Sequence, residues 1–180
     1  MSKFEINNIQ PAIEADLQHG TYIVLLNVRD LPPHLLLMSR GELFSLSIKG
    51  PKLHLPLELQ LKLIKRAQIP SIFVKLNAEI HVQEGVIYKQ AVSSTLAFSK
   101  ADVGFATCLS PIKAFCDAIF HINTGEANFI YELLPLLDKK GFVEGYHGIN
   151  MQPYMIVNTF FMEKYSMQTI YDSITSAVAV

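Results

Sequence analysis

The sequence has no tryptophan and only two cysteines, and it lacks the short motifs that mark most nucleotide, metal and redox sites. It contains neither a Gly-x-Gly-x-x-Gly nor a P-loop segment. Its six histidines are dispersed, without His-x-x-x-His spacing, and no Cys-x-x-Cys pair occurs, so no local segment supplies a set of metal ligands. We therefore expect no cofactor and no metal site, and free thiols in place of a disulfide.

Neither sign of charge is in excess, because 15 Lys and Arg residues face 16 Asp and Glu residues. Without a basic surplus to neutralise phosphates, nucleic acid is excluded as the expected partner. Long apolar runs are also missing: the longest, 22–28 and 31–38, fall short of the roughly 18 residues of a membrane span. The first residues carry acids and amides where a signal peptide has its apolar stretch, which predicts a cytoplasmic protein without a transmembrane segment.

Apolar residues, in contrast, are abundant for a chain of this charge. Half of the 180 residues are hydrophobic, and the mean hydropathy is +0.27. The length predicts a single domain over residues 1–180, and the apolar surplus exceeds what one core is expected to absorb. We therefore expect a homo-oligomer or an apolar ligand groove.

The order of apolar patterns predicts an α+β domain, with an antiparallel sheet packed against helices. Arg40 and Gly41 form a short turn between two apolar stretches, which indicates a hairpin. Ser110 followed by a proline indicates a helix N-cap, and Pro135 is expected to kink or split a later helix that begins near Thr124. The expected strands are 20–30, 34–39, 42–50, 71–77, 85–92 and one or two within 147–161, and the expected helices are 57–68, 110–122, 124–141 and 163–178. The first of these helices is ambiguous, because residues 53–63 also alternate at the period of a strand.

Cys108 is the candidate nucleophile. It lies in the segment GFATCLSPIKAF, just before a predicted helix, where unpaired backbone N–H groups and the helix dipole stabilise a thiolate. This position favours an exposed thiol of low pKa. Lys113 would lower that pKa further. A thiolate nucleophile needs a base within hydrogen-bond reach, and His34, at the start of a strand, is the preferred candidate. Cys116, in the middle of the same helix, is expected to be a core residue.

The hairpin HLLLMSRGELFSL, followed much later by TCLSPIKAF, resembles the permuted papain-like branch of the NlpC/P60 superfamily, which includes lecithin-retinol acyltransferase-like and YiiX-like proteins. In that branch a histidine opens a strand, a glycine turn follows, and a cysteine later begins a helix. His34 and Cys108 match these two positions. The resemblance implies a papain-like fold and a hydrolase or acyltransferase acting on peptide, amide or lipid-ester bonds.

The third catalytic position departs from the family pattern. The strand after the turn offers Ser45 and Ser47, with His54 further on, and Ser45 is the candidate orienting group. In the unpermuted order His147 would pair with Cys108, with Asn150 or Asn158 as the orienting group. A non-catalytic α+β module that binds a small apolar ligand or a protein partner is the alternative function.

Overall fold

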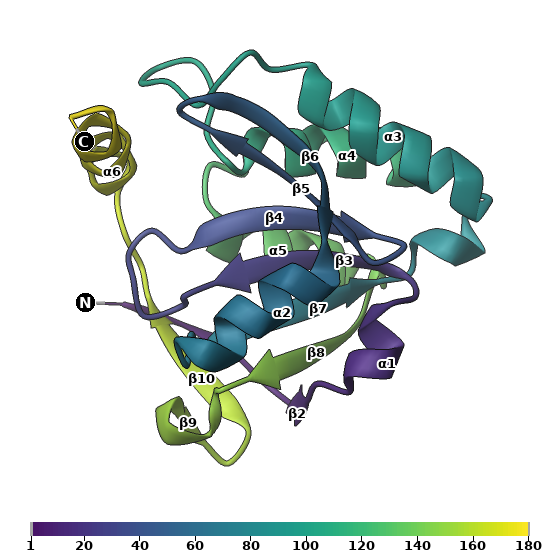
Figure 1. The fold of residues 1–180 in the computed structure, drawn as a ribbon, viewed down its shortest axis with the longest axis vertical. Coiled ribbons are helices and arrows are strands. Elements are labelled where there is room, and N and C mark those ends of the chain that lie inside the picture. Colours follow the sequence, from purple (N-terminus) through teal and green to yellow (C-terminus); the bar gives the residue numbers. More distant parts are fainter. Residues whose placement is uncertain (1, 180) are drawn as a thin grey trace.

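The computed structural model describes residues 2–179, and a seven-stranded sheet runs through the middle of the fold (Figure 1). The strand order is β2-β8-β7-β3-β4-β5-β6. All neighbouring strands are antiparallel except β2 and β8, which are parallel. The strands of this sheet are β2 (Ile9–Pro11), β3 (Thr21–Leu26), β4 (His34–Ser39), β5 (Glu42–Ser47), β6 (Gly50–Pro56), β7 (Ser71–Leu76) and β8 (Val143–Ile149).

Helices cover both faces of this sheet (Figure 1). The helices α1 (Glu14–Leu17) and α2 (Leu57–Arg66) lie on one face, and α3 (Glu84–Leu96), α4 (Ser110–Phe120) and α5 (Ile130–Lys139) lie on the other. The short helix η1 (Ala78–Ile80) connects β7 to α3. Because side chains alternate between the faces of a strand, each central strand contributes to both layers.

The core is accordingly divided into two main clusters by the sheet. On the α2 side, Tyr22, Leu36 and Phe73 pack with Leu57 and Leu61 of the helix. On the other side, the alternate positions of the same strands pack against α3, α4 and α5; these positions include Ile23, Leu25, Leu35, Leu37, Ile72 and Val74. A second core therefore takes up much of the apolar surplus that the composition shows.

A smaller antiparallel sheet joins the two ends of the chain, with the order β1-β10-β9. Its strands are β1 (Lys3–Ile6), β9 (Met155–Ile156) and β10 (Thr159–Glu163), and η2 (Gln152–Tyr154) precedes β9. The last helix, α6 (Met167–Val178), follows β10 and stands beside the main body (Figure 1). Within residues 2–179, no helix has the length and apolar character that a membrane crossing requires.

Several elements are confirmed. The hairpin turns at Arg40 and Gly41, both with positive φ, and helices occur at α2, α4 and α6. The segment 20–30 contributes β3, in the interior of the sheet. Cys116 is fully buried in α4, as expected, and both cysteines are free thiols.

The prediction of a strand over 85–92 is wrong, because these residues belong to α3. The segment GVIYKQAV contains β-branched and aromatic residues, which favour strands. In the structure, Ile87, Ala91, Ser94 and Thr95 follow helical spacing and form the buried side of α3. Packing of that side against the sheet outweighs the local preference of Val86, Ile87 and Tyr88.

Two helix starts also differ from the prediction. Ser110 is the first residue of α4 and Leu109 is the N-cap; the Ser110 hydroxyl accepts a hydrogen bond from the Thr107 N–H at 2.9 Å. Helix α5 begins at Ile130, six residues after Thr124, where the Glu132 carboxylate accepts hydrogen bonds from preceding backbone N–H groups. Pro135 lies within α5 and does not split it.

Candidate functional site

Cys108 lies just before α4, against the core on the α3 to α5 side of the sheet. Its side chain is half-buried, and burial raises the pKa of the thiol above its ordinary value. The backbone N–H groups of Leu35 and of Cys108 itself favour the thiolate and offset part of this rise. The prediction of an exposed thiol of low pKa is therefore wrong, because burial outweighs the backbone donors.

His34 begins β4, one residue before Leu35. Leu35 and Leu37 belong to the core that contains the Cys108 contacts, whereas Leu36 and Met38 belong to the core under α2. By this alternation His34 lies on the α2 side of the sheet, away from Cys108. His34 is exposed, and its pKa is lowered by the loss of part of its hydration and then by the charge of Lys52, without a contribution from Cys108. The structure brings Cys108 next to the strand of His34 but not to its imidazole.

Other contacts engage the remaining residues of the cysteine-hydrolase hypothesis, which are Ser45, Ser47 and Lys113. Ser45 is buried in β5 and pairs with Lys52 of β6. Ser47 donates a hydrogen bond to the Gly50 carbonyl at 3.1 Å. Lys113 donates to the Gly125 carbonyl at 3.3 Å, which engages its ammonium group in the loop between α4 and α5.

The alternative base, His147, is half-buried in β8 with its ring against Tyr22, at a centroid distance of 6.5 Å. The side chain of Asn150, one of its two candidate orienting residues, is bound to backbone groups elsewhere: its amide donates to the carbonyls of Ile64 and Ile69, at 3.1 and 3.3 Å. At Asn158, the other candidate, the backbone carbonyl accepts a hydrogen bond from the N–H of Ile9. His147 belongs to a different part of the surface, a large cleft.

This acidic cleft has a volume of about 1020 Å³ and is bordered by the β1 to β2 turn, α1, β8 and α5. Its lining includes one lysine, Lys75, and two histidines, His19 and His147. The carboxylates of the lining are Glu5, Asp16, Glu79, Asp138 and Glu144. The lining therefore carries an excess of negative charge, contributed by segments that are far apart in the sequence.

Tyr22 belongs to the lining of this cleft, together with the carboxylates. Its ring is buried, and its hydroxyl donates to the Asp16 carbonyl at 3.2 Å. Burial, and then the charges of Asp16, Glu144 and Glu79, raise the pKa of Tyr22 to about 12. Carboxylates from α1, β8 and η1 therefore act together on one buried phenol.

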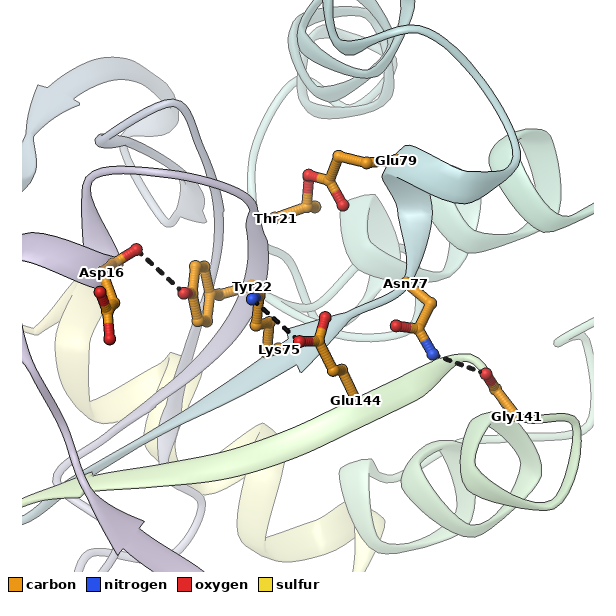
Figure 2. Close-up of polar contacts among 8 residues, drawn as sticks. All are labelled: Asp16, Thr21, Tyr22, Lys75, Asn77, Glu79, Gly141 and Glu144. Atoms are coloured by element: carbon orange, nitrogen blue, oxygen red, sulfur yellow. Dashed lines mark hydrogen bonds and ion pairs between the residues drawn. The ribbon is translucent and has the colours of Figure 1, made fainter.

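Lys75 is the lysine of the cleft lining, and it is already paired with a carboxylate. Its ammonium group lies 3.0 Å from the Glu144 carboxylate, and the Thr21 hydroxyl donates to Glu79 at 2.9 Å (Figure 2). The β7–β8 register shifts between Lys75 and Leu76, which leaves Glu144 unpaired between Val143 and Gly145. Such irregularities re-aim side chains, and here Glu144 faces Lys75.

Two further ionisable groups of the cleft have shifted pKa values. Burial and then the charge of Lys75 lower the pKa of His147, and the charges of Glu144 and Asp16 oppose this shift. Burial and then the charge of Asp138 raise the pKa of Tyr146 to about 12. Groups with perturbed pKa values that converge in one large cleft are typical of a functional site.

Comparisons with known proteins leave the chain without an identified relative. No family model, curated protein or solved structure matches it. The resemblance to the NlpC/P60 superfamily thus stays a prediction. The structure confirms the α+β class, with a mixed sheet that is antiparallel except at β2 and β8.

A second polar cluster lies away from the acidic cleft, between β5, β6 and α3. His54 Nδ1 is 2.8 Å from Glu42 Oε2 and 2.8 Å from the Tyr88 hydroxyl, which donates to Glu42. His54 has a left-handed φ of 55°. The hydrogen bonds of Tyr88 and His54 lower the pKa of Glu42. These contacts hold the edge strand β6 to α3, and they orient His54 toward Glu42 instead of toward His34.

Sequence reasoning missed the acidic cleft because its residues form no local motif. Only His147 of the lining was a candidate, and the signal there was a histidine within a glycine-containing strand segment. The carboxylates lie on five different parts of the chain, and each one alone reads as an ordinary exposed charge. No spacing rule joins Asp16 to Glu144.

Proposed function

We propose that this protein is a binding module whose acidic cleft takes a cationic ligand. The observation that carries the proposal is a cleft of about 1020 Å³ whose lining holds five carboxylates and a single lysine. A concave site lined by one sign of charge concentrates ligands of the opposite sign. The raised pKa of the buried Tyr22, caused by burial and by three of these carboxylates, supports a common negative field.

Apolar side chains such as Phe4, Ile13 and Val143 share the wall of this cleft with the charged groups, and the charged groups give it a preference among ligands. The Lys75 ammonium group at 3.0 Å from Glu144 indicates the chemistry that fits. A ligand ammonium or guanidinium group would take the same kind of position. In this respect Lys75 competes with the ligand, because it already neutralises one of the carboxylates.

The cysteine-hydrolase hypothesis stays a prediction. It requires a thiolate at neutral pH and an imidazole within hydrogen-bond reach. The surroundings of Cys108 supply two backbone N–H donors, but burial raises the pKa of the thiol and His34 lies on the other face of the sheet. Of the two candidate functional sites, the acidic cleft is therefore better supported than the surroundings of Cys108.

Calorimetric titration with spermine, a flexible polycation, tests the proposal. We expect binding that weakens as NaCl rises from about 20 to about 300 mM, because salt screens the carboxylates. The double variant Glu79→Gln/Glu144→Gln should lose about tenfold in affinity, and Lys75→Met should gain affinity because Glu144 loses its resident partner. Both variants keep side chains of similar length.

Glu126→Gln is the matched control, since Glu126 is an exposed acid in the loop before α5 and does not line the cleft. It should bind spermine like the parent protein. The proposal is overturned if spermine gives no saturable binding, or if the control loses as much affinity as the double variant.

A further inference from the structure

One edge of β8 is only partly covered. On one side, β7 pairs with β8 from Val143 to Ile149. On the other side, β2 pairs with it only at Tyr146, His147 and Gly148. The stretch Val143–Gly145 therefore has a strand neighbour on one side alone. Outward-facing N–H and C=O groups of such an edge are a template for another strand.

This free edge faces the acidic cleft. Val143, Glu144 and Gly145 belong to its lining. The chain ahead of β2 leaves the main sheet at Asn8, which has a left-handed φ of 58°, and continues back into β1, which pairs with β10. The place in the main sheet beside Val143–Gly145, where β2 would continue, therefore borders the cleft. No residue of β8 is fully buried.

We propose that the cationic ligand is an extended basic segment of a polypeptide, which pairs with Val143–Gly145 and continues the line of β2. This inference rests on the proposed binding of cations in the cleft and adds the recognition of the ligand backbone. At about 3.3 Å per residue, the free edge spans about 10 Å and pairs with three to four residues of the partner.

The two faces of β8 supply acids to both sets of ligand side chains. His147 packs on Tyr22, on the α2 side of the sheet, where Asp16 lies near. Tyr146 packs against the opposite core, where Asp138 acts on it. Side chains of an added strand alternate between these two faces, so lysines or arginines at consecutive positions would each meet a carboxylate.

Glu144 gives this edge its selectivity. It is exposed and stands at the register shift between β7 and β8, directly on the free stretch. A charged residue on an open edge deters pairing with neutral or acidic strands. A basic segment neutralises that charge. A basic partner strand is therefore favoured over a neutral or acidic one.

Backbone methylation of a peptide probe separates strand addition from recognition of charge alone. The probe is acetylated and amidated heptalysine, compared with two analogues of the same charge that carry N-methyl groups on every second backbone amide or on all of them. A strand uses alternate amides for its neighbour, and because every residue is lysine, the alternately methylated analogue can shift by one residue and present its free N–H groups. We expect the fully methylated analogue to lose about tenfold in affinity while the alternately methylated one binds nearly as the parent peptide does. Amide hydrogen exchange at Val143–Gly145 should slow when heptalysine binds.

The outcomes distinguish the two proposals. If heptalysine and both analogues bind equally and exchange at Val143–Gly145 is unchanged, strand addition is overturned and cation binding stands. If neither spermine nor heptalysine binds, the proposed function itself fails. Glu126→Gln again serves as the control and should show the same selectivity between the analogues as the parent protein.

Discussion

At the scale of single residues, Cys108 shows how burial competes with backbone donors for control of a thiol. The N–H groups of Leu35 and Cys108 favour the thiolate, and burial disfavours it more strongly. Position before a helix was visible in the sequence, whereas the depth of the side chain was not. Depth depends on how the loop packs against β4, which no local pattern of residues encodes.

Alkylation of Cys108 should therefore be slow at neutral pH. The raised pKa keeps the group protonated, so the rate of reaction with iodoacetamide should rise only above the pKa of about 8.5 of a free thiol. His34→Ala should leave the rate profile unchanged, because His34 lies on the other face of the sheet. Mass spectrometry of the peptide that contains Cys108 measures the rate. An inflection below that of a free thiol, which moves up in His34→Ala, would restore the hydrolase hypothesis.

At the scale of elements, the end of β8 is tied to the end of α2 by one side chain. Asn150 has a left-handed φ of 58°, and its amide donates to the carbonyls of Ile64 and Ile69. The carbonyls at a helix C-terminus lack partners within the helix. Asn150 supplies one there and fixes α2 against the sheet. The sequence indicated α2 itself but gave no sign of this connection, because its donor and acceptors are more than 80 residues apart.

Asn150→Gly isolates the contribution of these hydrogen bonds, since glycine accepts the positive φ and removes only the side chain. We expect a loss of about 1–2 kcal/mol in the free energy of unfolding. Asn150→Ala should cost more, because alanine adds backbone strain at the same φ. Urea denaturation followed by circular dichroism measures both. Asn128→Ala, which removes an exposed local contact, is the control. A stability of Asn150→Gly equal to that of the control would refute the role of Asn150.

The helix α3 marks the limit of element prediction from local preference. Its sequence contains residues typical of strands, yet its buried positions recur at helical spacing and pack against the sheet. The hairpin of β4 and β5 was predictable because its turn chemistry and its apolar stretches agree. Where the local preference and the period of burial disagree, as in α3, tertiary packing decides.

At the scale of the whole molecule, the apolar surplus has a structural explanation. The sheet is covered on both faces, so it needs two sets of apolar side chains. The expected homo-oligomer stays a prediction, and the two-sided core removes much of the reason for it. The acidic cleft belongs to the same scale, because it exists only where α1, β8, α5 and the β1 to β2 turn meet. A sequence read segment by segment has no access to such a site.

The buried phenol of Tyr22 makes the stability of the whole fold sensitive to alkaline pH. Burial raises the pKa of Tyr22 from 10.0 to about 12. Between pH 10 and 12 the unfolded chain releases this proton while the folded chain keeps it, so the folded state binds more protons and its stability falls as the pH rises. The full effect of the Tyr22 shift is about 2–3 kcal/mol, present below pH 10 and lost through pH 12.

Tyr22→Phe should be less stable at pH 8, because it lacks the hydrogen bond to Asp16, and it should show a shallower decline above pH 10. Urea midpoints at pH 8, 10 and 11 give the decline of stability with pH in the parent protein and in Tyr22→Phe. Equal declines would mean that Tyr22 does not keep its proton in the folded state.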